Sequence, residues 1–128
     1  MLAGVNSLAT GFFAVALGIL LGAFGAHGLG DVGAQRLGYW ETATLYHFIA
    51  GFGLVALGLV QMVRPVGGWP AIALLLGILL FSGSLYAMGL GGPRVLGAVT
   101  PIGGTALIVG FAGLGLQAFK LGASARRP

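Results

Sequence analysis

The chain has 128 residues, of which 58% are hydrophobic, 26 are glycine and only 6% are charged. Soluble domains are about one quarter charged and contain about 7% glycine, so this composition excludes a soluble enzyme, a nucleic-acid-binding module and a disordered chain. It indicates an integral membrane protein. The net charge of +4 comes from a few dispersed cations, which are typical of topology signals and lipid-headgroup contacts and do not predict a nucleic-acid partner.

Four apolar segments are long enough to cross a bilayer, which takes about 20 helical residues. In chain order they are approximately Val5–Ala26, Thr42–Val63, Pro70–Gly89 and Thr100–Phe119. No basic stretch precedes the first segment, so we expect a retained span and not a signal peptide. Strands of a membrane barrel would alternate over about ten residues, whereas these apolar runs are continuous. The sequence predicts an all-α membrane protein, a four-transmembrane-helix antiparallel bundle that forms one domain over residues 1–128.

The connections between these spans predict how the chain is oriented. The first connection, before Thr42, is the longest and the most polar. An even number of spans puts both termini on one side, and that side carries four cations: Arg64, Lys120, Arg126 and Arg127. The opposite side carries two cations and both carboxylates: Arg36, Arg94, Asp31 and Glu41. The positive-inside rule therefore predicts a multi-pass protein with cytoplasmic termini.

Glycine is abundant in every predicted span, although it weakens a helix in water. In lipid, helices associate through close van der Waals contact, and small residues let their backbones approach. Gly18, Gly22 and Ala26 recur at every fourth position of the first span, and Gly25 widens that face. Gly103 and Gly104 serve the fourth span in the same way. We predict that these residues form packing seams; the alternative is a groove for a lipid tail or a partner helix.

Scarce polar residues gather at the non-cytoplasmic end of the predicted bundle. They form a candidate polar cluster of seven residues: His27, Glu41, Tyr46, His47, Ser82, Ser84 and Tyr86. Of these, His47 is the only ionisable residue expected within the hydrocarbon, where such residues face inward and are often functional. The structural alternative is a neutral histidine that is hydrogen-bonded to a neighbouring helix, with Thr44 as a local partner.

Other polar and aromatic residues at the helix ends have structural interpretations. We expect His27 to close the end of the first span, and Glu41 to begin the second span, where the helix dipole stabilises a carboxylate. An ion pair of Glu41 with Arg36 or Arg94 is compatible with that position. Three aromatic residues are expected to be anchors at the membrane interface: Tyr39, Trp40 and Trp69.

No catalytic constellation is evident in the sequence. There is no cysteine, and the spacing of the two histidines and two carboxylates matches no established metal-ligand motif. Haem ligation by two histidines needs similar depths on facing helices, whereas these two are offset. We therefore predict no catalytic residue, no metal and no cofactor. An enzyme is the least favoured class of function.

Residues Gly22–Leu29, which read GAFGAHGL, resemble the signature of small bacterial membrane proteins grouped as domain of unknown function 423. Eukaryotic relatives of this group are called transmembrane protein 256. Three further segments fit the same pattern in order, so the resemblance covers nearly the whole chain: Glu41–Tyr46, Leu80–Tyr86 and Thr100–Gly104. The resemblance implies four spanning helices, an inner-membrane location and no established activity.

The chain departs from that family pattern at one position. A histidine often follows the tyrosine by four residues, where this chain has Ala50, and His47 stands where glutamine or histidine is seen. A role of the missing histidine does not carry over, so His27 becomes the better family-linked candidate.

Two functions remain open from the sequence. The favoured one is a non-enzymatic accessory, assembly or lipid-interacting component that forms a homo-oligomer or joins a larger membrane complex. The alternative is a small transporter or binding protein with a polar pocket at the non-cytoplasmic end. A pocket that touches both the His27 and the Ser82 regions would favour the alternative, and dry, close-packed helices there would count against it.

Overall fold

The computed structural model describes residues 1–128 and is almost entirely helical. The first two spans are single helices, α1 (Leu2–His27) and α2 (Ala34–Val63). The third span is continuous through α3 (Trp69–Gly77), the π-helical η1 (Ile78–Ser82) and α4 (Gly83–Gly89). The fourth joins the 3₁₀ turn η2 (Arg94–Ala98) to α5 (Thr100–Ala125). All four are long and apolar enough to cross a membrane, which confirms the predicted antiparallel four-helix fold.

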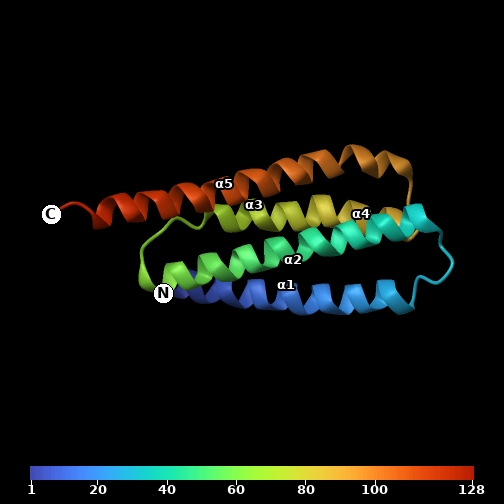
Figure 1. The fold of residues 1–128 in the computed structure, drawn as a ribbon, viewed down its shortest axis with the longest axis horizontal. Coiled ribbons are helices and arrows are strands. Elements are labelled where there is room, and N and C mark those ends of the chain that lie inside the picture. The colour runs from blue at the N-terminus through green and yellow to red at the C-terminus, as the bar shows by residue number, and fades with distance from the viewer.

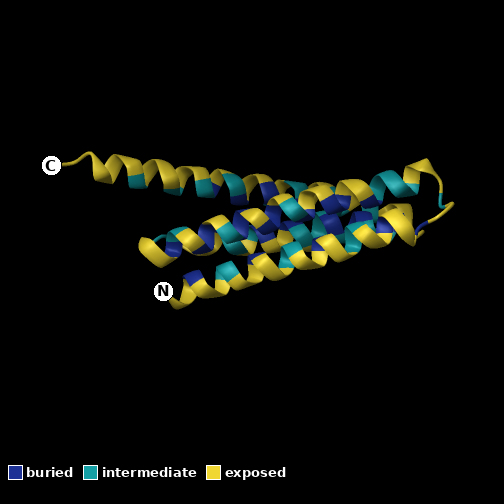
Figure 2. Ribbon diagram, turned by 60° about the horizontal axis from the view of Figure 1, so that its bottom comes forward, coloured by how far each residue is buried: buried dark blue, intermediate teal, exposed yellow.

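The spans lie side by side in chain order, with α2 and the third span in the middle and α1 and α5 outside (Figure 1). α1 packs on α2, and α5 packs on the third span. Of the most apolar stretch of each span, 44% of residues are buried in α2 and 33% in the third span, against 17% in each outer helix. Figure 2 shows the same contrast in the burial of the ribbon. Each outer helix therefore packs on its neighbour through one narrow face, and the rest of its surface is exposed.

The seam between α1 and α2 is formed by glycines seven residues apart. All four are buried: Gly4, Gly11, Gly18 and Gly25. A Cβ atom added to Gly11 would lie 2.6 Å from the backbone nitrogen of Val55, and one added to Gly58 would lie 2.5 Å from that of Leu8. The two backbones thus touch where neither helix carries a side chain.

This period corrects the predicted four-residue seam. Gly18 and Gly25 belong to it, but Ala26 is exposed, and a Cβ atom on Gly22 would meet only Thr44 Cγ2 at an ordinary 3.4 Å. The reason is angular: a step of four residues turns about 40° around a helix, whereas seven residues bring the chain back to nearly the same face. Only the seven-residue series keeps facing one antiparallel neighbour along the whole length of α1.

The seam between α5 and the third span is built around Gly103. A Cβ atom there would meet the backbone of η1, 2.6 Å from the carbonyl carbon of Leu80. At the adjacent Gly104, the nearest atom is in the Phe81 ring at 3.4 Å. Gly103 therefore sets the approach of the two helices, and Gly104 lies at the edge of the contact.

The second span begins eight residues earlier than its predicted start at Thr42. Gly33, with φ of 92°, precedes the first residue of α2, so the connection shrinks to six residues between His27 and Ala34. The charged residues Arg36 and Glu41 interrupt the apolar pattern of this segment, so hydropathy alone does not predict that the helix begins here. Glu41 consequently lies about two turns inside α2, which corrects its predicted place at the helix start, since the helix dipole acts mainly within the first turn.

Candidate functional site

Trp40 lies in the half of the bundle that contains the predicted polar cluster, and it contacts two neighbouring helices there. Its side chain is 3% exposed, and its indole Nε1 donates a hydrogen bond of 2.7 Å to the carbonyl of Leu21 in α1. The ring centroid lies 4.6 Å from that of Tyr86 in α4 and 5.3 Å from that of Phe24 in α1. Trp40 is therefore a core residue that joins three helices, and its predicted role as an interfacial anchor is wrong.

Next to Trp40, His47 and Tyr86 belong to one hydrogen-bond chain. His47 is 2% exposed, and its Nδ1 lies 3.0 Å from the Tyr86 hydroxyl. That hydroxyl donates to Thr44 Oγ1 at 3.3 Å, and Thr44 donates to the Trp40 carbonyl at 3.0 Å. Because a carbonyl only accepts, the direction of donation runs from His47 Nδ1 through Tyr86 and Thr44 to Trp40. Thr44, expected as a local partner of His47, is thus connected to it through Tyr86.

The other ring nitrogen of His47 is less well satisfied. Nε2 is buried and has no hydrogen-bond partner. An unpaired buried polar atom costs about 1–3 kcal/mol, so the rest of the chain has to hold this ring in place. The interaction with Tyr86 is therefore the principal polar contact of the His47 side chain.

The two serines of the predicted cluster connect helices by hydrogen bonds. The Ser82 Oγ donates to the Ala43 carbonyl of α2 at 2.8 Å, from the last residue of the π-helical turn. Ser84 Oγ lies 2.6 Å from Thr100 Oγ1 at the start of α5. Tyr46 is 38% exposed and packs edge-to-face on Phe81, with 4.9 Å between the ring centroids. These polar groups serve contacts between neighbouring helices.

The remaining two members of the predicted cluster lie elsewhere. His27 is the last residue of α1, as expected, and both it and Glu41 are exposed. They line a surface groove of about 400 Å³ between the end of α1 and the start of α2, with Trp40 as part of its wall. Arg36, considered as a partner for Glu41, donates from Nε to the Gly89 carbonyl at 2.9 Å, where it caps the end of α4.

The structure thus divides the predicted cluster into three parts. His47 and Tyr86 belong to the hydrogen-bond chain, the serines connect helices, and His27 and Glu41 line an open groove. No three histidine or carboxylate side chains come together as a group that could hold a metal ion. The burial of Trp40 was not predicted from the sequence, although Trp40, Thr44 and His47 follow the spacing of a single helix face.

Replacing Tyr86 by phenylalanine is expected to lower the free energy of unfolding by about 1–2 kcal/mol, because it removes the hydroxyl that connects His47 to Thr44. Unfolding in mixed detergent micelles, followed by circular dichroism, would measure the change. Tyr46→Phe is the matched control, since its half-exposed ring packs on Phe81 and its hydroxyl bonds to no other group. Equal losses in the two variants would contradict a stabilising role for the hydrogen-bond chain.

Comparison with known proteins agrees with the family resemblance of the sequence motifs. Residues 21–104 match the family described as "Protein of unknown function (DUF423)". The chain belongs to this family. The matched segment runs from the end of α1 to the first turns of α5, and so contains the hydrogen-bond chain of His47 and Tyr86 and the His27 groove. The resemblance expected from the sequence motifs is confirmed.

Relatives of this DUF423 protein are named membrane proteins. A UPF0382 membrane protein of Staphylococcus saprophyticus is 44% identical over 102 residues, which are 78% of this chain and 85% of the relative. The UPF0382 membrane protein YwdK of Bacillus subtilis is 39% identical over 111 residues, or 81% of this chain and 88% of the relative. No solved structure matches the chain significantly. The comparisons and the four spans agree on an integral membrane protein.

Proposed function

We propose that this DUF423 protein is a non-enzymatic component of the bacterial inner membrane that acts by associating with other membrane components, as a homo-oligomer or in a larger complex. The arrangement of the outer helices supports this proposal best. α1 and α5 each bury only a narrow face within the chain, and α1 presents large aromatic side chains on its free surface, with Phe12 57% and Phe13 75% exposed. Such surfaces can be shared between lipid and a partner helix.

The interior of the bundle gives less support to the transporter alternative. Ser82 is fully buried and bonded to the Ala43 carbonyl, whereas His27 and Glu41 line a groove on the outside. The residues expected to line one pocket therefore do not face a common space. A permeation path would need these packed helices to separate, at the expense of the contacts that hold α2 to the third span.

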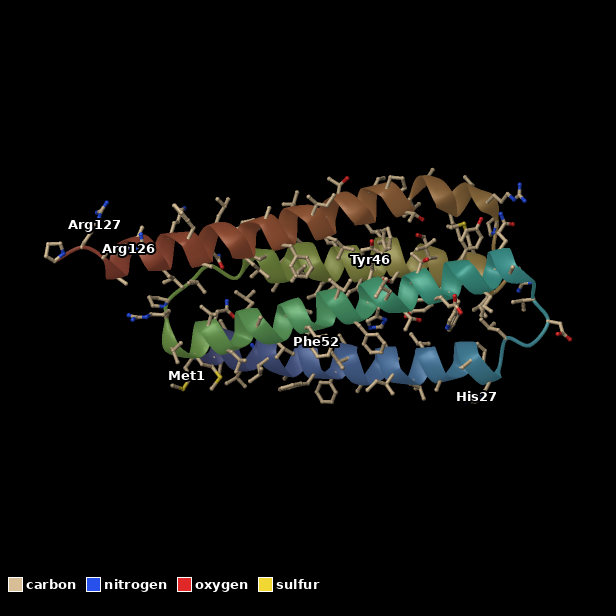
Figure 3. The ribbon with its side chains drawn as sticks, in the orientation of Figure 1. Met1, His27, Tyr46, Phe52, Arg126 and Arg127 are labelled. Carbon is tan, nitrogen blue, oxygen red and sulfur yellow. The ribbon has the colours of Figure 1, made fainter.

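The proposed orientation places both termini in the cytoplasm. Arg64 follows the last residue of α2, and Lys120 and the two terminal arginines lie in the last turns of α5 or beyond it, all at that end. Both carboxylates, Asp31 and Glu41, lie toward the other end, in the first connection and the first turns of α2. Figure 3 shows Met1, Arg126 and Arg127 at one end of the bundle and His27 at the other. Because the chain has no cysteine, Asp31→Cys should react with an impermeant maleimide in intact cells, and Ser124→Cys only after permeabilisation. The reverse pattern would refute the orientation.

Cross-linking in native membranes tests the association. A photoreactive amino acid at Phe13 in α1 or Ile108 in α5, which are 75% and 71% exposed, should give protein adducts of discrete mass. The same amino acid at Asp31, in the first connection, is the control and should give few. Lipid adducts alone at both helix positions, together with a partner-free monomer in mild detergent, would refute the proposal.

A further inference from the structure

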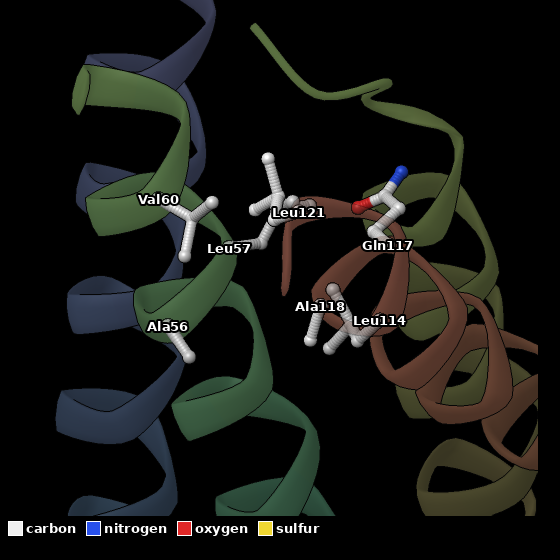
Figure 4. Close-up of a pocket in the computed structure, with 7 residues that line it drawn as sticks. All are labelled: Ala56, Leu57, Val60, Leu114, Gln117, Ala118 and Leu121. Atoms are coloured by element: carbon white, nitrogen blue, oxygen red, sulfur yellow. The ribbon is translucent and has the colours of Figure 1, made fainter. Parts of the chain in front are cut away.

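An apolar groove lies between α2 and α5 in the half of the bundle that contains the termini. It has a volume of about 220 Å³, and six of its seven lining residues are hydrophobic. Figure 4 shows α2 on one side and α5 on the other, with the groove between them. The lining residues are Ala56, Leu57, Val60, Leu114, Gln117, Ala118 and Leu121. Its floor is closed by Leu57, which is 1% exposed, while the small side chains of Ala56 and Ala118 leave it open.

Toward the helix ends, the groove continues into a polar hollow of about 420 Å³. Gln117 and Leu121 line both, and the hollow adds Lys120 and Ser124 of α5 together with the loop from Pro65 to Gly67 and Trp69. The Gln117 side chain donates a hydrogen bond of 2.9 Å to the Gly67 carbonyl, which ties the loop to α5 at the boundary between the two parts. Trp69 is 48% exposed, as an aromatic residue at headgroup level would be.

The charged side chains at this end of the bundle are all positive. Lys120 lines the hollow, and Arg64 follows directly on α2. Both carboxylates of the chain, Asp31 and Glu41, belong to the opposite end. No acidic side chain is therefore available to neutralise Lys120, and a negative group of a ligand can take that place. Basic side chains at this level of a membrane protein attract anionic headgroups.

We propose that this groove is a binding site for one anionic phospholipid, with an acyl chain between α2 and α5 and the phosphate beside Lys120. The proposal requires only that the chain spans a membrane, and it does not rest on the association proposed above. Burying an acyl chain here gains no hydrophobic free energy, because the bilayer is equally apolar. Selectivity must therefore come from the headgroup charge, and the groove determines where the lipid sits.

Native mass spectrometry of the full-length protein, released from nanodiscs of equal parts phosphatidylglycerol and phosphatidylcholine, tests the site. We expect retention of one phosphatidylglycerol molecule, in preference to phosphatidylcholine. Lys120→Gln should reduce this preference about fivefold, the factor expected for one basic residue near an anionic surface. Arg127→Gln is the matched control, because it makes the same change in net charge beyond the end of α5 and outside the hollow.

A second pair of variants tests the groove itself. Ala118→Phe should fill the space between α2 and α5 and reduce retention of either lipid several-fold. Ala112→Phe, at an exposed position of the same helix outside the groove, should leave retention unchanged. If Ala118→Phe fails to fold, the Lys120→Gln comparison still decides the headgroup site.

Three results would overturn the proposal. Equal retention of the two lipids by the native chain would show that there is no selective headgroup site. Equal effects of Lys120→Gln and Arg127→Gln would show that the net charge of the protein attracts the lipid, and not a site at Lys120. A change of oligomeric state in folded Ala118→Phe, with lipid retention unaltered, would assign the groove to a second copy of the chain. Each of these results is independent of the cross-linking pattern that tests the association.

Discussion

Replacing Gly103 by alanine is expected to destabilise the folded protein by about 3 kcal/mol, the upper end of the usual range for overpacking a close contact. The added methyl group would meet the backbone of η1 at Leu80 and Phe81, not the end of a flexible side chain. A backbone cannot move aside by changing a rotamer, so α5 has to shift away from the third span. The shift would loosen the Leu107 contact with Gly77 as well.

The neighbouring glycines provide controls for this prediction. Gly104→Ala places its methyl group 3.4 Å from the Phe81 ring, and Gly115→Ala has no atom within 4 Å. Both should be close to neutral. Unfolding in mixed detergent micelles, with helical content as the signal, would measure all three variants. A loss for Gly103→Ala no larger than that for Gly104→Ala would show that the α5 seam does not depend on backbone contact.

Truncating Trp40 to alanine is expected to lower the free energy of unfolding by about 3–5 kcal/mol, as for other large aromatic residues removed from cores. The indole contacts Phe24 and Tyr86 and bonds to the Leu21 carbonyl, so its loss opens a cavity where α1, α2 and α4 meet. Trp40→Phe should retain part of the packing and lose the hydrogen bond, with a smaller effect.

The control for Trp40 is an aromatic residue that no helix covers. Phe119 in α5 is 79% exposed, so Phe119→Ala should change the stability little. Near-ultraviolet circular dichroism reports the tertiary packing of the aromatic rings, and we expect Trp40→Ala to lose much of that signal before helical content falls. A Trp40→Ala variant as stable as Phe119→Ala would restore the interfacial role predicted for Trp40 from the sequence.

Part of the candidate site could be predicted from the sequence. His47, Ser82 and Tyr86 were predicted as members of one polar cluster, and the structure buries the first two and joins His47 to Tyr86. The separation of His27 from this chain was not predictable, because it depends on where α2 begins. Eight additional helical residues, Ala34–Glu41, carry Trp40 between α1 and α4 and leave His27 outside.

The glycines that form the packing seams could not be predicted from the sequence either. The sequence shows that glycines are frequent in α1, but it does not show which of them meets a backbone. Gly11 does and Gly22 does not, since only the seven-residue series keeps facing α2. The crossing of two helices depends on both partners at once, and no single segment contains that information.

That the chain is an integral membrane protein with four spanning helices could be predicted from its residues alone, because length, hydropathy and scarcity of charge are properties of each separate segment. The family could also be predicted, from short contiguous motifs. Three features became visible only in the packed bundle: which glycines form the seams, the place of Trp40 in the core, and the division of the polar cluster between the interior and the surface. Those features depend on how far each helix extends and which face its neighbour covers. In lipid, where apolar burial does not distinguish one neighbour from another, close contact between particular helices makes that choice.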